Sequence, residues 1–256
     1  MVFIDVRELA PDCINRTIKA LPEYQSCLLE GCLGQRFIGA GLADRTVVIH
    51  GIPGNALGAY LDGATLEVFG NAQDAVGDTM NAGRIIIHGY VGDTCGYAMR
   101  GGEIYVQGNA GYRTGVHMKA YGDTCPVMVV GGRVGSFLGE YQAGGLIIVL
   151  GLEAADTPAP AAVPAGVAES GAIAGNFPCT GMHGGKVILR GNAEGLRFPA
   201  QVSARPAKPE ELVEIAPYVR NYGTFFGVDP EEILAGPYTL VSPRSGNPYG
   251  SMYVDN

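Results

Sequence analysis

The chain has 256 residues, of which 47% are hydrophobic and 16% are charged, and its formal net charge is −8. The negative charge excludes most nucleic-acid-binding proteins, because these need a basic surface for phosphates. Forty glycines in a polar chain would indicate disorder, but the hydrophobic content predicts a folded protein with a sizeable core. The sequence has no 18-residue apolar run and no signal-type N-terminus, so a cytoplasmic protein without a membrane span is expected.

Residues 1–25 precede any regular pattern and are predicted to form an N-terminal cap segment. Asp12 is a candidate helix cap, and the helix is expected to run to about Leu21 because Pro22 cannot continue it. This segment is expected to cover one end of the repeats that follow, where strand edges would otherwise be unpaired.

Residues 26–191 contain a repeat in which a glycine ends each short aliphatic run. The separations between successive glycines are 20, 19, 19, 19, 24, 19 and 40 residues. Such a constant spacing indicates stacked structural units instead of a flexible segment. The glycines are Gly31, Gly51, Gly70, Gly89, Gly108, Gly132, Gly151 and Gly191.

Apolar residues stand two and four positions before every one of these glycines, while the position one before is mixed. This period-two alternation predicts one half-buried strand in each repeat. The positions two before are Leu29, Ile49, Val68, Ile87, Val106, Val130, Val149 and Leu189. The positions four before are Cys27, Val47, Leu66, Ile85, Ile104, Met128, Ile147 and Val187.

Further glycines recur three, seven, and twelve or thirteen residues after the repeat glycines, as at Gly92, Gly77 and Gly83. Glycine at fixed corners supplies positive φ and lets stacked backbones approach closely. We therefore predict an all-β protein, a right-handed parallel β-helix of about eight coils of ~19 residues, with short helical N- and C-terminal extensions. The right hand is favoured by the general bias of parallel crossovers.

The Ala/Pro-rich stretch 152–170 interrupts the repeat and is predicted to be a surface loop, with a partner-binding arm as the alternative. Residues 192–256 form a C-terminal extension, in which helices are predicted over 208–222 and from Asp229, the latter closed by Gly236. The aromatic residues of this extension are expected to pack on the far end of the repeats or on another subunit. They are Tyr222, Phe225, Phe226, Tyr238, Tyr249 and Tyr253.

The sequence offers no catalytic, cofactor-binding or metal-binding constellation, so no site residue is assigned. His50 and His88 share one position of the repeat two units apart, about 10 Å by strand spacing, which is too far for one metal ion. The cysteines, at 13, 27, 32, 95, 125 and 179, lack zinc-ligand spacing, and buried thiols are expected. GDTC occurs at 92–95 and 122–125, and its Asp and Thr are typical of turns.

The stretches Gly101–Arg113 and Gly51–Gly89 resemble the glycine-repeat (GXGXG) domain of the glutamate synthase large subunit, and the resemblance covers roughly residues 27–191. In that family the domain is a non-catalytic right-handed β-helix. The resemblance therefore implies a structural subunit of a split, archaeal-type glutamate synthase, an oxidoreductase complex of ammonia assimilation and glutamate biosynthesis. In this role the chain braces partners between which ammonia passes to 2-oxoglutarate.

The implied partners are a glutaminase-type amidotransferase subunit and an FMN/iron–sulfur synthase subunit. FMN, an iron–sulfur cluster and NAD(P)H are then expected in those subunits, and no cofactor in this chain. An N-methylglutamate synthase complex and the glycine-repeat subunit of a formylmethanofuran dehydrogenase are alternatives with the same repeat. A stand-alone hydrolase or transferase that uses a groove on the repeats is a further alternative from a different class.

Overall fold

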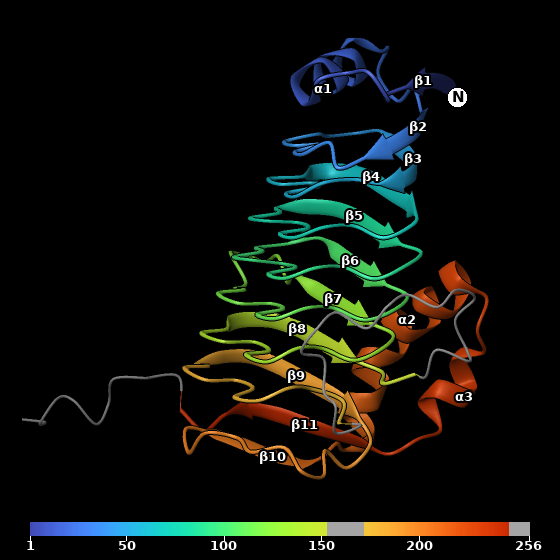
Figure 1. Cartoon of the computed structure of the whole chain (residues 1–256). Coiled ribbons are helices and arrows are strands. Elements are labelled where there is room, and N and C mark those ends of the chain that lie inside the picture. The colour runs from blue at the N-terminus through green and yellow to red at the C-terminus, as the bar shows by residue number, and fades with distance from the viewer. Residues whose placement is uncertain (153–171, 246–256) are drawn as a thin grey trace, which may run out of the picture.

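The computed structural model describes residues 1–152 and 172–245, in which the chain forms eleven strands and three helices (Figure 1). The strands are β1 (Val2–Asp5), β2 (Cys27–Leu33), β3 (Thr46–Ile52), β4 (Asp62–Phe69), β5 (Ala82–Ile87), β6 (Glu103–Val106), β7 (Val127–Val130), β8 (Ala143–Val149), β9 (Gly184–Arg190), β10 (Val202–Pro206) and β11 (Tyr238–Pro243). The helices are α1 (Pro11–Ala20), α2 (Pro209–Phe226) and α3 (Pro230–Leu234). Apart from Leu152, the predicted insertion 152–170 lies outside the described residues, as do Tyr249 and Tyr253.

All eleven strands belong to one sheet, in the order β1-β2-β3-β4-β5-β6-β7-β8-β9-β11-β10. Each strand from β1 to β9 pairs in parallel with the next one in the sequence, so each repeat adds one strand to the edge of the sheet. The last two pairings, β9 with β11 and β11 with β10, are antiparallel. With strands about 4.8 Å apart, the parallel part of the column is roughly 38 Å long.

The prediction of an all-β, right-handed parallel β-helix of about eight coils is wrong. The structure has a single, mostly parallel sheet with a helix layer against it, which is an arrangement of the α/β type. Each repeat gives one strand to this sheet. Most other residues of each repeat form turns. Backbone hydrogen bonds and single bridges, such as the one between Ala72 and Val91, connect these turns to the neighbouring repeats. Glycines and other residues with positive φ interrupt the extended backbone there, so no second or third sheet of named strands forms in the described ranges.

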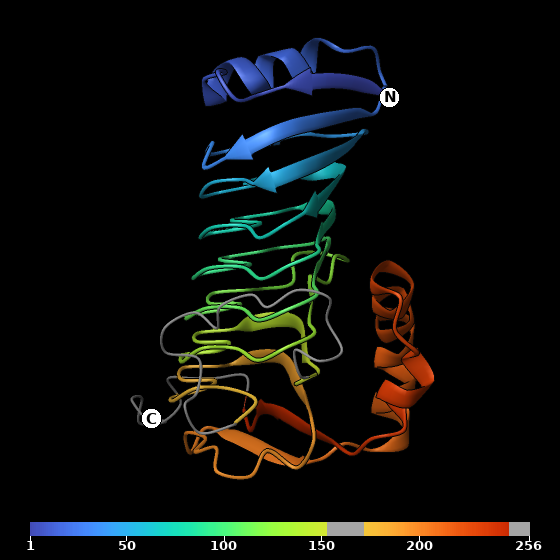
Figure 2. The same ribbon diagram turned by 45° about the vertical axis from the view of Figure 1, so that its right-hand side comes forward.

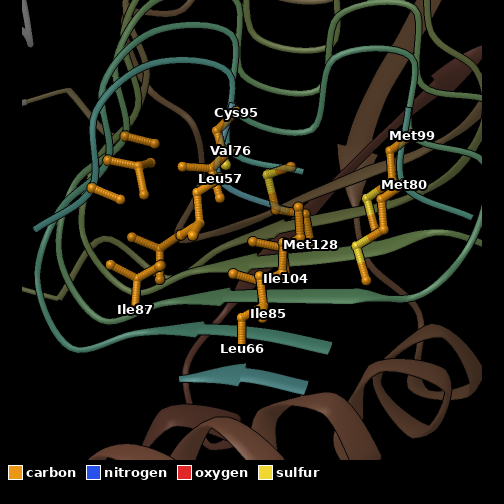
Figure 3. Close-up of a cluster of buried hydrophobic side chains, with 14 of the residues drawn as sticks. Leu57, Leu66, Val76, Met80, Ile85, Ile87, Cys95, Met99, Ile104 and Met128 are labelled. Atoms are coloured by element: carbon orange, nitrogen blue, oxygen red, sulfur yellow. The ribbon is translucent and has the colours of Figure 1, made fainter. Parts of the chain in front are cut away.

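The predicted inner face of the strands is confirmed. All sixteen apolar positions are fully buried and belong to one hydrophobic cluster. Leu66, Ile85 and Ile104 pair in register from strand to strand, and Figure 3 shows them in one row. Leu57 and Val76, which come from the turns, lie opposite this row in the same figure and complete the core between strand and turns.

The corner role predicted for the glycines holds at Gly77, where φ is +68°. A Cβ at this position would lie 2.4 Å from Cδ1 of Ile104, which belongs to the strand after the next one. At Gly92 a Cβ would lie 2.1 Å from the Oδ1 atom of Asp74, although the backbone there is ordinary. Glycine is therefore required at both positions because an atom of a neighbouring repeat lies where a Cβ would be. At Gly77 it is required also because the backbone is left-handed.

The second face of the sheet differs from the prediction of half-buried strands. Tyr105, Val129 and Ile148 lie on this face and are fully buried, because α2 covers β5 to β9 (Figure 2). The buried side of α2 presents Ile215, Val219, Tyr222 and Phe226 to this part of the molecule. Strands covered on both faces lose the polar half of the alternation, as the sequence VMVV of β7 shows.

The N-terminal segment closes one end of the column, as predicted, with Ile14 and Ile18 of α1 fully buried in the main core. Its predicted cap is wrong, however. The helix begins at Pro11 after Ala10, which makes no side-chain cap, and Asp12 lies in the first turn, where it pairs with Arg16 at 2.9 Å. Pro at the first helical position has no N–H to satisfy and therefore starts the helix without such a cap.

The C-terminal extension confirms both predicted helices but changes the place of its aromatic residues. Asp229 caps α3 by accepting a hydrogen bond from the Glu231 N–H at 2.9 Å. Phe225 and Phe226 pack against the sheet face beside Tyr105 and His88, not on the end of the column. The extension also contributes β11, a strand that the sequence did not predict and that lies between β9 and β10.

Candidate interaction surface

The described residues contain no cluster of three or more His, Cys, Asp or Glu side chains able to hold a metal ion. Cys27, Cys32, Cys95 and Cys179 are buried, and burial raises the pKa of each of these thiols. Cys125 is exposed, but partial burial and the nearby Glu214 raise its pKa as well. Raised pKa values keep these thiols protonated at neutral pH, so none is poised as a nucleophile.

The first GDTC stretch is a structural turn, as its Asp and Thr predict. The Oδ1 atom of Asp93 accepts a hydrogen bond of 2.8 Å from the Tyr112 N–H in the next repeat, and the Thr94 hydroxyl donates to the Asp93 carbonyl. Asp74, one repeat earlier, accepts from the Asp93 N–H in the same way at 2.9 Å. In the second stretch the Thr124 hydroxyl donates to the Tyr121 carbonyl. These side chains connect and fix turns.

The histidines do not converge on one site. His50 and His88 lie on the outer face of the sheet, where they contact Glu30 and Glu67 at 2.9 Å. The ring of Phe69 lies between them, 5.5 Å from His50 and 4.3 Å from His88. His117 is exposed on a turn, and His183 contacts the Gly181 carbonyl oxygen at 3.0 Å.

The outer face of β1 to β4 is uncovered by any described part of the chain, and we call it the open face. Its residues form two rows in register across the strands. The first row is Phe3, Leu28, Val48 and Glu67, and the second is Asp5, Glu30, His50 and Phe69. Phe3 is 62% exposed and Phe69 is 47% exposed, so large rings of this face contact solvent. Figure 2 shows that α2 lies beside the other half of the column.

The open face continues directly into the covered part of the sheet. Glu67 of the first row is followed in register by Ile86, which is 4% exposed beneath the helix layer, and then by Tyr105. The second row leads from Phe69 to His88, whose ring is 5.2 Å from Phe226 of α2. One sheet face therefore has two halves of similar chemistry, of which the chain covers one.

A second exposed group, the turn row, consists of Tyr97, His117 and Tyr141. The ring centroids of Tyr97 and His117 are 5.9 Å apart, and His117 stacks on Tyr141 at 5.2 Å. His117 and Tyr141 have φ values of +55° and +53°, among sixteen non-glycine residues with positive φ in the described ranges. A left-handed residue recurs at the same place in successive turns, as Ala98, His117 and Tyr141, and Tyr97 comes directly before the first of them.

A cavity of about 400 Å³ opens near the base of the column between Arg133, Ile173 and Arg190. The Arg190 Nε–H donates to the Ile233 carbonyl at 3.2 Å, which ties this guanidinium to α3. Gly151 and Gly191 form much of the remaining wall. This lining provides no nucleophile or carboxylate pair, and the open face is the stronger candidate for a functional surface.

Two comparisons relate the sequence to known proteins. The family model described as GXGXG motif matches residues 10–235. The uncharacterized protein MJ1350 of Methanocaldococcus jannaschii is 38% identical over 263 residues, which span 99% of this chain and 96% of the relative. Both matches extend well beyond the repeats, so they include α1 at one end and α2 at the other.

The fold is also similar to that of solved structures, and one of these is a chain of the formyltransferase/hydrolase complex of Methylorubrum extorquens, determined in complex with methylofuran. The TM-score is 0.62 at 18% identity, over 93% of this chain and 89% of the other. A likeness at this identity concerns the fold alone.

Proposed function

This chain belongs to the GXGXG motif family, and from that membership we propose that it is a non-catalytic subunit of a multi-subunit enzyme complex. The observation that carries the proposal is the open face, where the exposed rings of Phe3 and Phe69 stand beside Leu28 and Val48 on an otherwise covered sheet. Exposed apolar areas of this kind mark surfaces that a partner protein covers.

The column suits a bracing role. Each repeat contacts the next through backbone hydrogen bonds and close glycine contacts, so a rigid body of roughly 38 Å is built from short strands. A rigid body with an uncovered face can hold two larger subunits in a fixed orientation.

No helix among the described residues is both long enough and apolar enough to cross a membrane.

For the kind of complex, we favour one of the formyltransferase/hydrolase or formylmethanofuran dehydrogenase type, in which this chain takes the place of the glycine-repeat subunit. The support is the structural likeness to a chain of a formyltransferase/hydrolase complex over 93% of this chain. In such a complex the chemistry lies in the partner subunits, and this chain supplies their relative position.

A glutamate synthase-type complex is the second candidate, favoured by the resemblance of Gly101–Arg113 to the glycine-repeat domain of that enzyme. The partners would then be a glutaminase-type amidotransferase and an FMN/iron–sulfur synthase subunit. FMN, the iron–sulfur cluster and NAD(P)H would bind to those subunits and not to this chain, whose described cysteines offer no cluster of ligands. An N-methylglutamate synthase complex would divide the roles in the same way.

The test is to produce the tagged chain together with each of the two sets of partner subunits and to separate the products by size-exclusion chromatography. We expect one set to elute with the chain as a stable complex, and its activity, formyl transfer or glutamine-dependent synthesis, to need the chain. A chain that elutes alone with both sets contradicts the proposal. Turnover of an ester or acyl donor by the chain alone, abolished by a single substitution, would instead show a stand-alone enzyme.

A further inference from the structure

We propose that the open face binds an amphipathic helix of a partner subunit, that this helix carries basic residues, and that it continues the layer that α2 begins. The inference rests on the proposed function, because it names the chemistry of the partner at that surface. It is carried by the geometry of α2 on the sheet, by the place where α2 ends, and by the charge of the open face.

The covered half of the sheet shows how a helix fits this column. Glu214 near the start of α2 pairs with Lys186 of β9, and Phe226 at its end contacts His88, just after β5. Twelve helical residues rise about 18 Å, and four strand spacings measure about 19 Å. The helix therefore advances about three residues for each strand it crosses, so a helix that runs along the column brings a side chain of its buried face near every strand.

The same match applies to the open face. The strands β1 to β4 lie in the same sheet with the same parallel register, and their outer rows continue into the rows beneath α2. Three strand spacings are about 14 Å, so a partner helix of roughly ten to fourteen residues would cover them. Leu28 and Val48 are partly buried already and form the floor on which such a helix would pack.

The chain does not place its own described residues on the open face. Helix α2 ends at Phe226, and Gly227, with φ of +69°, reverses the chain. The next helix, α3, returns along α2, and Arg220 pairs with Glu231 at 2.9 Å between them. The helix layer therefore stops at Phe226 and leaves the ring of Phe69 47% exposed.

The charge of the open face selects a basic partner. Asp5 is paired with Arg7, whose hydrogen bonds lower the pKa of that carboxyl. The carboxylates of Glu30 and Glu67 each lie 2.9 Å from a histidine nitrogen, and no Lys or Arg of the described residues forms a salt bridge with either of them. Lys or Arg side chains at the edge of a docked helix can reach these carboxylates while apolar residues cover Leu28.

The experiment uses the full chain in the complex isolated with its partner subunits. Val48→Glu places a charge on the open face, and Val213→Glu is the matched control, because Val213 is 73% exposed on α2. We expect Val48→Glu to weaken subunit association by about tenfold or more, as loss of a central apolar contact does, and the control to leave it unchanged. Circular dichroism of each free chain checks that both variants remain folded.

A photo-crosslinking residue at position 48 then identifies what covers the face. We expect it to link to a Lys- or Arg-containing helical segment of a different subunit. Linkage to a second copy of this chain overturns the inference, as does unchanged association of Val48→Glu. Either result leaves the proposed function standing if the complex itself forms, whereas a chain that never joins a complex overturns both.

Discussion

Replacement of Gly77 by alanine tests the packing of turn against strand, because the structure separates two costs at this position. The first is the backbone, whose φ of +68° is unfavourable for alanine by roughly 1–2 kcal/mol. The second is space, because the added methyl group would lie 2.4 Å from Cδ1 of Ile104. Forcing an extra methyl group into a packed core costs about 1–3 kcal/mol. We expect Gly77→Ala to lower the free energy of unfolding by roughly 2–5 kcal/mol.

Two further variants isolate these costs. Gly41 has φ of +59°, and a Cβ built there has no neighbour within 4 Å, so Gly41→Ala carries the backbone cost alone. Ile104→Val removes the Cδ1 atom that a methyl group at position 77 would meet. By itself it costs about 0.5–1.5 kcal/mol. Combined with Gly77→Ala, it is expected to recover about 1 kcal/mol or more relative to the sum of the two single variants.

The assay is urea unfolding of the purified chains followed by circular dichroism, with the double-mutant cycle built from midpoints and slopes. Two results would refute the reasoning. One is equal destabilisation by Gly77→Ala and Gly41→Ala, which would mean that the close approach has no energetic weight. The other is strict additivity in the cycle, which would mean that the methyl group and Ile104 do not meet.

Three other predictions concern burial and charge. Ile87→Asp puts an unpaired charge into the core, which costs several kcal/mol of folding free energy. We therefore expect circular dichroism to show an unfolded chain, and a folded variant would contradict the described core. Cys95 is buried, with a pKa raised to about 12, and should react with a thiol reagent at pH 8 only after unfolding. Cys125 is exposed and should react in the native state, although slowly because its pKa is raised too; the order of modification decides this. The hydrogen bond from Arg205 lowers the pKa of Glu211 from its ordinary value of 4.5 to about 2. This pair therefore stabilises the folded chain fully above pH 4.5, and the stabilisation is lost as the pH falls toward 2. Glu211→Gln should flatten the acid limb of the stability curve in that window.

The strands could be predicted from the sequence because each one is a local pattern repeated many times. An apolar pair such as Ile85 and Ile87 has little meaning alone, but eight pairs in one register specify parallel neighbours and a common buried face. The glycines at fixed offsets added the corners. The structure confirms both, since every predicted pair is buried and Gly77 lies against Ile104 as a corner residue should.

The architecture around the strands could not be predicted in the same way. The turn segments contain left-handed residues such as Arg113 and His117, which keep them from forming further strands, and nothing in the sequence distinguishes these from ordinary turn residues. The α2 layer is a contact between residues more than a hundred positions apart, such as Tyr222 and Gln107, whose hydrogen bond measures 2.9 Å. The sequence signal for a second covered face was the loss of alternation in β5, β7, β8 and β9, where aliphatic residues follow one another.

There is also a physical reason why sequence reasoning assigned no site residue. Catalytic and metal sites need different side chains that meet at one point, whereas a repeat places similar side chains in rows. In this chain the rows bring together rings and aliphatic groups, as at Leu28 and Val48, and the carboxylates among them are hydrogen-bonded to neighbouring side chains. Such rows form an apolar surface and not a site at one point. This surface can be located only when it is known which strands are covered and which are exposed.

The uncovered strands are also the unusual part of the fold. Parallel sheets are found with both faces covered, because their strands are held by slightly weaker ladders and carry apolar residues on both sides. The described residues, 1–152 and 172–245, meet this condition from β5 to β9 and not from β1 to β4, although the rows of side chains run through both halves. A face that stays in contact with solvent would have polar residues such as Glu67 along the whole row. Leu28 and Phe3 stand there instead, and each apolar Å² kept in water forgoes about 25 cal/mol. Covering this face would therefore release free energy, which is what the proposed partner helix would gain.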